Sequence, residues 1–274
     1  MGKLDHKIAV ITGSTRGIGK AIAHEFVRQG AKVVITSSSA LNVRNAVAEF
    51  PPGTAYGCLC DVVSAADMEH LIAAAVGKFG RIDCFINNAG ISDPFQSITE
   101  SDPEVWGKVI DTNLKGTYNG CRAAISYFLR ENIPGKIINM AGSGTDSGSN
   151  TPWMSAYGST KAAIARFTSA VAREYRHTGI SVMLLHPGLV RTGMLSSENP
   201  TQELSRQLAT FRTVLDIFAQ SPSVAAKLAV QLASDWSDTK TGIYLSALNG
   251  RKKKWLLMTY PFRKIAKRID RRTY

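Results

Sequence analysis

The chain has little cysteine and no long hydrophobic run. No stretch of about eighteen consecutive apolar residues occurs, so the sequence predicts no membrane-spanning helix. The first apolar run starts near Lys7, too early to leave room for a secretory signal, and we expect a cytoplasmic location. The four cysteines lack the spacing of a zinc site, and a reduced core accounts for them without a disulfide framework. They are Cys58, Cys60, Cys84 and Cys121.

Acidic residues become scarce at the carboxyl end of the chain. The net charge is +12, from 33 Lys or Arg and 21 Asp or Glu. Residues 251–274 hold ten Lys or Arg and one acid, Asp270, which leaves 23 Lys or Arg and 20 Asp or Glu in residues 1–250. The sequence therefore predicts a nearly balanced body, residues 1–250, and a basic extension, residues 251–274.

Within the body, short apolar runs alternate with longer segments that carry apolar side chains at three- and four-residue spacing. The short runs are predicted strands at residues 10–12, 32–35, 56–60, 82–86, 136–139 and 182–185. The longer segments are predicted helices at residues 18–29, 65–78, 113–131 and 156–177. This alternation predicts an α/β fold: a single Rossmann-type, doubly wound parallel sheet with helices on both faces. Ligands of such sheets bind at the carboxyl ends of the strands.

A glycine-rich loop follows the first predicted strand and opens a helix. Residues 12–19 read Thr-Gly-Ser-Thr-Arg-Gly-Ile-Gly. Glycines let the backbone approach a pyrophosphate, and the helix amino terminus favours its negative charge. A glycine turn without a ligand is the alternative, but the position after the first strand favours dinucleotide binding. The expected contacts come from Gly13, Thr15, Arg16, Gly17, Ile18 and Gly19.

The end of the second predicted strand bears on the choice of cofactor. An acidic residue there would bind the ribose 2′-hydroxyl of NAD, but the chain continues as Ser37-Ser38-Ser39. With Arg16 nearby, Ser37 and Ser38 would instead suit a 2′-phosphate, so NADP(H) is favoured over NAD(H). In the alternative interpretation Arg16 is solvated and the serines form a turn.

Tyr157 and Lys161 are spaced four residues apart and therefore lie on one face of a predicted helix. A fixed ammonium stabilises phenolate, so we expect Lys161 to lower the pKa of Tyr157 from about 10 toward neutrality. A tyrosine tuned in this way can exchange a proton with an alcohol or a carbonyl. Alone the pair indicates only a helix surface; beside a phosphate loop it indicates catalysis.

Taken together, the motifs resemble the short-chain dehydrogenase/reductase family from about Lys7 to Leu248. The resemblance implies a nicotinamide-dependent oxidoreductase in which Asp61 and Val62 contact the adenine and Lys161 also binds the nicotinamide ribose. It further implies that Asn88, Ala89 and Gly90 line the cofactor groove and that Val190 and Thr192 hold the carboxamide. The matching motifs are Thr12–Gly19, Asp61-Val62, Asn87–Gly90, Thr112–Gly116, Tyr157–Lys161, and Pro187-Gly188 followed by Val190 and Thr192.

The same resemblance implies the chemistry. Hydride moves between the nicotinamide and a carbonyl carbon, while Tyr157 gives or takes the proton of the oxygen. Asn113 would distort its helix and help to hold a water that connects Lys161 to solvent. The structural alternative for Asn113 is a helix-start cap, because Asp111-Thr112-Asn113 is prone to capping.

The serine expected to hydrogen-bond the substrate oxygen is the least regular match. The family spacing counted back from Tyr157 lands on Gly144, and Ala141-Gly142 stands where a serine pair is common. Ser143 is our choice, with Thr145 and Ser147 as alternatives. Ser143 as a spacer between glycines is the structural alternative.

The segments that would contact the substrate are apolar. Residues 193–222 run into a helix with an apolar stripe, which in the family forms a substrate lid but elsewhere is more often core. With Trp153 and Met154 before Tyr157, an apolar or aromatic carbonyl or alcohol substrate is favoured. The stripe consists of Leu204, Leu208, Phe211, Val214, Leu215, Ile217 and Phe218.

The basic extension, residues 251–274, mixes cations with aromatic and aliphatic residues. This composition indicates binding to an anionic membrane surface or to an acidic partner. The alternative without a binding function is a solvated tail. Nucleic acid is not expected, because no nucleic-acid-binding fold accompanies the charge.

Two functions therefore compete. The first is an NADPH-linked reductase or alcohol dehydrogenase, and the second is a cofactor-binding sensor or scaffold that has lost its chemistry. The family resemblance also implies a homo-dimer or homo-tetramer through the helices that start near Asn113 and Ala156.

Overall fold

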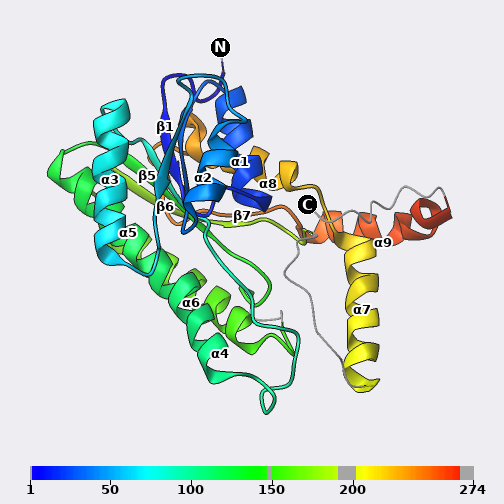
Figure 1. The fold of residues 1–274 in the computed structure, drawn as a ribbon. Coiled ribbons are helices and arrows are strands. Elements are labelled where there is room, and N and C mark those ends of the chain that lie inside the picture. The colour runs from blue at the N-terminus through cyan, green and yellow to red at the C-terminus, as the bar shows by residue number, and fades with distance from the viewer. Residues whose placement is uncertain (1, 147–149, 191–201, 266–274) are drawn as a thin grey trace.

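A computed structural model describes residues 2–146, 150–190 and 202–265 (Figure 1). Its strands form one parallel sheet and are β1 (Ile8–Ile11), β2 (Lys32–Ser37), β3 (Ala55–Leu59), β4 (Cys84–Asn87), β5 (Gly135–Met140), β6 (Ile180–His186) and β7 (Tyr244–Ser246). Their order across the sheet is β3-β2-β1-β4-β5-β6-β7. The expected doubly wound, Rossmann-type fold is confirmed.

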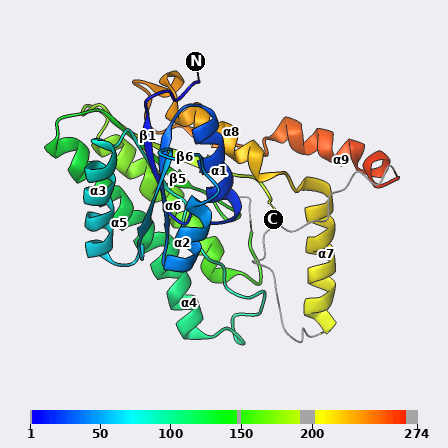
Figure 2. The same cartoon turned by 45° about the horizontal axis from the view of Figure 1, so that its top comes forward.

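Helices cover both faces of this sheet (Figures 1 and 2). One buried cluster joins α1, α2 and α8 to the sheet, and a second joins α3, α5 and α6 to the opposite face. The helices are α1 (Gly17–Arg28), α2 (Ala40–Val47), α3 (Ala65–Phe79), α4 (Pro103–Ile110), the π-helical turn η1 (Asp111–Lys115), α5 (Gly116–Arg130), α6 (Ser155–Glu174), α7 (Gln202–Phe218), α8 (Pro222–Ala233), the 3₁₀ turn η2 (Asp235–Ser237) and α9 (Gly250–Ile265).

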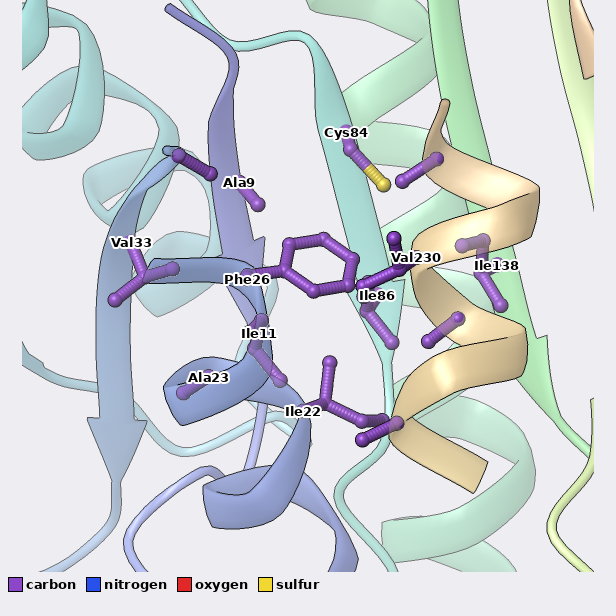
Figure 3. Close-up of a cluster of buried hydrophobic side chains, with 14 of the residues drawn as sticks. Ala9, Ile11, Ile22, Ala23, Phe26, Val33, Cys84, Ile86, Ile138 and Val230 are labelled. Carbon is purple, nitrogen blue, oxygen red and sulfur yellow. The ribbon is translucent and has the colours of Figure 1, made fainter. Parts of the chain in front are cut away.

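Each central strand is buried on both sides. Ile11 of β1 points into the cluster under α1 and α8, whereas its neighbour Val10 points into the cluster under α3 and α5. Figure 3 shows Phe26 of α1 between the strands and Val230 of α8. Phe26 is 1% exposed, and burial of such a side chain contributes about 1.5–3 kcal/mol. The near-continuous apolar runs of the sequence follow from this two-sided burial.

The strand order fixes where a ligand can bind. β1 pairs with β2 on one side and with β4 on the other. The strands are therefore added toward one edge of the sheet up to β3 and toward the other edge from β4 onward. Ligands of doubly wound sheets bind at such a switch point, at the carboxyl ends of the strands. The glycine-rich loop and the segment Asn88–Gly90 therefore lie next to each other.

The structure corrects one predicted helix boundary. The helix predicted to begin at Asn113 begins instead at Pro103, because the Asp102 side chain accepts a hydrogen bond from the Glu104 N–H at 2.8 Å and proline suits the first turn. Asn113 lies in η1, inside a continuous helical stretch, so its interpretation as a helix-start cap is wrong.

The sequence prediction also lacked the helices α2, α8 and α9 and the strand β7. The short strand β7 pairs in parallel with β6 and closes the edge of the sheet. Its sequence, Tyr-Leu-Ser, is too short to give an alternating pattern, so only the pairing reveals it.

Candidate active site

The glycine-rich loop adopts backbone conformations that only glycine accepts readily. Gly13 and Gly17 have φ values of +61° and +58°. A Cβ on Gly19 would lie 2.4 Å from Asn88 Nδ2, whereas a Cβ on Gly17 would meet nothing within 4 Å. Gly19 therefore packs the helix against the sheet, and Gly17 keeps open the space above the amino terminus of α1. This arrangement fits a pyrophosphate.

Hydrogen bonds from the segment that follows β4 hold the loop in place. The Thr12 hydroxyl accepts from the N–H groups of Asn88 and Ala89 at 2.9 and 3.0 Å. The Asn88 side chain donates to the carbonyl oxygens of Thr12 and Gly13 at 2.8 and 3.0 Å. Asn88 thus holds the glycine-rich loop in place by hydrogen bonds. It is also one of the residues expected to line the cofactor groove.

The end of β2 lies beside this loop. The Gly13 N–H donates to the Thr36 hydroxyl at 3.3 Å, which brings the loop to the residues that precede Ser37. Ser37 is half-buried, and Arg16 and Ser38 are exposed. The three residues expected to contact a 2′-phosphate therefore lie at the carboxyl ends of two neighbouring strands, β1 and β2. The remaining expected loop residues, Thr15 and Ile18, are half-buried.

The expected adenine contacts follow β3. Asp61 is exposed, and its carboxylate accepts from the Val63 N–H at 3.0 Å. Val62 is buried, and its carbonyl oxygen accepts from the Asn119 side chain at 3.0 Å. α5 therefore fixes the backbone that would lie along the adenine.

Tyr157 and Lys161 lie near the amino terminus of α6. Lys161 is 5% exposed, its ammonium donates to the Met140 carbonyl oxygen at 3.0 Å, and it lies 5.5 Å from the centre of the Tyr157 ring. Burial lowers the pKa of Lys161 to about 8 and raises the pKa of Tyr157 to about 12. The expected lowering of the Tyr157 pKa is therefore wrong for this structure, because burial of the phenol raises that pKa.

The loop after β5 approaches Tyr157 through its backbone. A Cβ on Gly142 would lie 2.4 Å from Tyr157 Oη, and one on Gly144 would lie 2.6 Å from the Gly158 carbonyl oxygen. A serine at either position would require its neighbours to shift. Ser143 stands between them and lines the neighbouring cavity.

The two alternatives to Ser143 differ in what can be said of them. The Thr145 hydroxyl accepts from the Gly142 N–H at 3.0 Å, so it shapes the loop. Ser147 lies outside the described residues.

Asn113 ties the cofactor side to the catalytic helix. It is fully buried in η1, and its side chain exchanges hydrogen bonds with the backbone of Ile91, at 2.8 and 2.9 Å. It also donates to the Thr160 hydroxyl at 3.1 Å. The local distortion expected at Asn113 is present. A Cβ on Gly90 would lie 3.2 Å from Asn113 Oδ1, so this approach favours glycine.

Asp93 is a residue that the sequence reasoning missed. It is 3% exposed, and its two carboxylate oxygens accept from the N–H groups of Ala156 and Tyr157 at 3.2 and 3.1 Å. The carboxylate therefore caps α6 at the residue that carries the phenol. The cap lies far from α6 in sequence, so no local capping pattern could reveal it.

A cavity of about 450 Å³ opens beside Ser143. Its walls come from the loop before α6, the end of β6, α7 and α9, and are mostly apolar and aromatic. Tyr157 packs against Phe95 and Met154, which line it. Phe211 of α7 lies 6.1 Å from Phe95 between ring centres. The apolar stripe of α7 thus lines a pocket at Phe211, Val214 and Phe218, while Leu215 is buried.

The segment after β6 holds the remaining expected cofactor contacts. Pro187 is buried and Val190 half-buried, and Gly188 has a φ of +77°. The Gly188 N–H donates to His186 Nδ1 at 3.0 Å, which fixes this turn at the edge of the cavity. Thr192 lies outside the described residues.

Residues 7–203 match the model of the family described as short chain dehydrogenase. The protein belongs to the short-chain dehydrogenase family. An uncharacterised oxidoreductase of Mycobacterium bovis is 37% identical over 250 residues, which cover 90% of this chain and 98% of the relative. A probable chlorophyll(ide) b reductase of Arabidopsis thaliana is 32% identical over 240 residues. That match covers 81% of this chain and 47% of the longer relative.

Solved structures of short-chain dehydrogenases agree with this assignment. A 3-ketoacyl-(acyl-carrier-protein) reductase from Brucella melitensis, complexed with NADH, superposes with a TM-score of 0.78 at 28% identity and covers 91% of this chain and 99% of its own. A short chain dehydrogenase from Mycobacterium smegmatis gives 0.75 at 26%, covering 92% and 95%. This short-chain dehydrogenase is therefore an oxidoreductase, and its family uses nicotinamide cofactors.

Proposed function

We propose that the protein is an NADPH-dependent reductase of an apolar carbonyl substrate, and that it oxidises the corresponding alcohol when cofactor supply favours that direction. The observation that carries the proposal is the position of Tyr157 and Lys161 beside the apolar cavity. The reductase names of the Arabidopsis and Brucella relatives support the reductive direction.

In this proposal Tyr157 supplies the proton. A pKa of about 12 keeps the phenol protonated at neutral pH, so Tyr157 can donate to an oxygen that gains negative charge. The Lys161 ammonium stabilises the phenolate that remains, and the Ser143 hydroxyl hydrogen-bonds the substrate oxygen. Asn113 positions α6 through Thr160. A bound nicotinamide cofactor supplies the hydride.

The preference for NADPH rests on charge at the end of β2. No carboxylate follows β2 directly, and the exposed Arg16 guanidinium is available to a 2′-phosphate together with Ser37 and Ser38. Replacement of Arg16 by Gln should raise KM for NADPH about tenfold and leave KM for NADH nearly unchanged. Equal effects on both cofactors would count against the 2′-phosphate contact.

Purified protein tests the activity directly. With NADPH and a panel of ketones and aldehydes, loss of nicotinamide absorbance should be fastest for aromatic and long-chain carbonyls. Tyr157→Phe should abolish turnover, whereas Tyr56→Phe, in the edge strand β3, should not. Turnover that survives Tyr157→Phe would reject the proton donor. NADPH binding without turnover on any carbonyl would favour the sensor or scaffold function instead.

The proposed assembly is a homo-dimer or homo-tetramer through α5 and α6. Tyr118 and Leu129 of α5 are about half exposed, as an unpaired interface would require. Sedimentation velocity gives the number of copies. A cytoplasmic location stays a prediction from the sequence.

A further inference from the structure

The carboxyl-terminal helix α9 exposes large apolar side chains. Trp255, Met258 and Phe262 are 59%, 75% and 73% exposed. Their spacing of three and four residues places them along one face of the helix, and Leu257, 57% exposed, lies on another side. Side chains of this size usually lose their contact with water, so the face is unpartnered within the described chain.

A neighbouring side of α9 is fixed to the rest of the protein. Leu256 is 6% exposed, and the Arg263 guanidinium donates to the Ile217 carbonyl oxygen of α7 at 2.9 Å. The Lys252 ammonium donates to the Gln220 side chain. Figures 1 and 2 both show α9 next to α7 at the periphery of the molecule. These contacts hold α9 next to α7 and leave Trp255, Met258 and Phe262 exposed to solvent.

The helix is also rich in cations. α9 contains six Lys or Arg and no Asp or Glu. Four of the six are exposed, namely Arg251, Lys253, Lys254 and Lys264. A helix that combines exposed aromatic and aliphatic side chains with exposed cations lies in the plane of an anionic membrane surface, where both find a partner.

A second copy of the chain fits this face less well. A two-fold contact would set α9 against α9 and bring six cations against six. An acidic protein surface would satisfy the cations but would leave the three large apolar side chains without an apolar environment.

We infer that α9 docks the protein on an anionic membrane surface, with Trp255, Met258 and Phe262 inserted at the boundary between head groups and acyl chains. No helix among the described residues is long and apolar enough to cross a membrane, so α9 lies on the surface. Lys253 of the same helix lines the cavity beside Ser143, so the helix that docks also forms part of the cavity wall.

Vesicle sedimentation tests the inference. Full-length protein is mixed with phosphatidylcholine vesicles that contain or lack phosphatidylserine, and the bound fraction is measured in the pellet. We expect binding only with phosphatidylserine and about a fivefold weaker affinity for each of Lys254→Gln and Arg251→Gln. The double variant Met258→Glu with Phe262→Glu should bind at least about tenfold more weakly. Ile98→Glu, at a site of similar exposure away from α9, should bind as the wild type does.

Fluorescence provides a second readout that does not depend on loss of binding. Brominated lipids should quench the wild-type emission, and Trp255→Phe should remove that quenching while the other tryptophans still emit. Circular dichroism and reductase turnover show that each variant is folded. Equal sedimentation of the wild type and the double variant would overturn the inference. So would absence of binding together with a dimer that the double variant splits, because α9 would then contact a second copy.

Discussion

The cofactor side and the substrate side of this protein are built differently. On the cofactor side, Thr12 and Asn88 fix the glycine-rich loop with directional hydrogen bonds of 2.8–3.0 Å. On the substrate side, Phe95, Phe211 and Trp153 form the walls through ring contacts with centroids 6.1–6.4 Å apart. A phosphate is bound by N–H groups that point at it, whereas an apolar substrate is bound by the apolar surface area that it buries. The first requirement constrains the backbone, and the second constrains only side-chain bulk.

Gly19→Ala should have the largest effect on cofactor binding, because it disturbs the hydrogen-bonded cofactor side. The new methyl group would lie 2.4 Å from Asn88 Nδ2 and 2.6 Å from the Gly13 carbonyl oxygen, so the loop must shift. We expect kcat/KM to fall about a hundredfold with every carbonyl substrate, as a displacement of about 1 Å does in positioned sites. Titration with NADPH measures the accompanying loss of cofactor binding.

Gly77→Ala is the matched control. Gly77 lies in α3 without a neighbour within 4 Å of the added carbon, so the same substitution should leave activity unchanged and favour the helix. Normal cofactor binding by Gly19→Ala would mean that the loop adapts, and the contrast between the two sides would fail.

The pH dependence should come from Lys161. Burial lowers its pKa to about 8, so the ammonium is present below pH 8 and is lost as the pH rises through that value. The rate of reduction should therefore be level below pH 8 and fall about tenfold per pH unit well above it. Tyr157, with a pKa of about 12, should not contribute below pH 10.

Steady-state profiles of kcat/KM for the wild type and Lys161→Arg check this prediction. Arginine stays charged, so the fall near pH 8 should disappear even where the rate is low. A wild-type profile that stays level through pH 10 would assign the role of Lys161 to something other than its charge.

The same contrast explains how far the sequence could be interpreted. The backbone geometry requires Gly13, Gly17 and Gly19, so a short sequence motif is enough to predict the loop. The alternation of strands and helices is enough to predict the sheet. The cavity leaves no motif, because Phe95 and Phe211 meet only through the fold. Ser143 was ambiguous for a related reason: the close approach of Gly142 to Tyr157 is visible only in three dimensions.

Phe211→Ala should affect the substrate side alone. The ring contributes to the cavity wall and contacts Phe95. Loss of its buried area should raise KM for aromatic and long-chain carbonyls about tenfold and leave KM for NADPH unchanged. A small ketone that does not reach α7 serves as the internal control. If KM rose equally for small and large carbonyls, α7 would act on the site as a whole and would not define its size.

Asp93→Asn should have the smallest effect and tests the connection between the two sides. Asp93 follows the cofactor segment and caps the helix of Tyr157, and an amide leaves only one acceptor for two N–H donors. The loss of charge at the helix amino terminus should lower the free energy of unfolding by about 1 kcal/mol. We also expect kcat to fall about fivefold, because the backbone of Tyr157 loses a partner, while KM for NADPH holds. Asp102→Asn removes the same negative charge from the cap of α4, at an exposed site, and should reduce stability slightly without lowering kcat. If urea unfolding and turnover gave the same result for both variants, Asp93 would only stabilise α6; a fall in kcat confined to Asp93→Asn would make it a residue that positions the phenol.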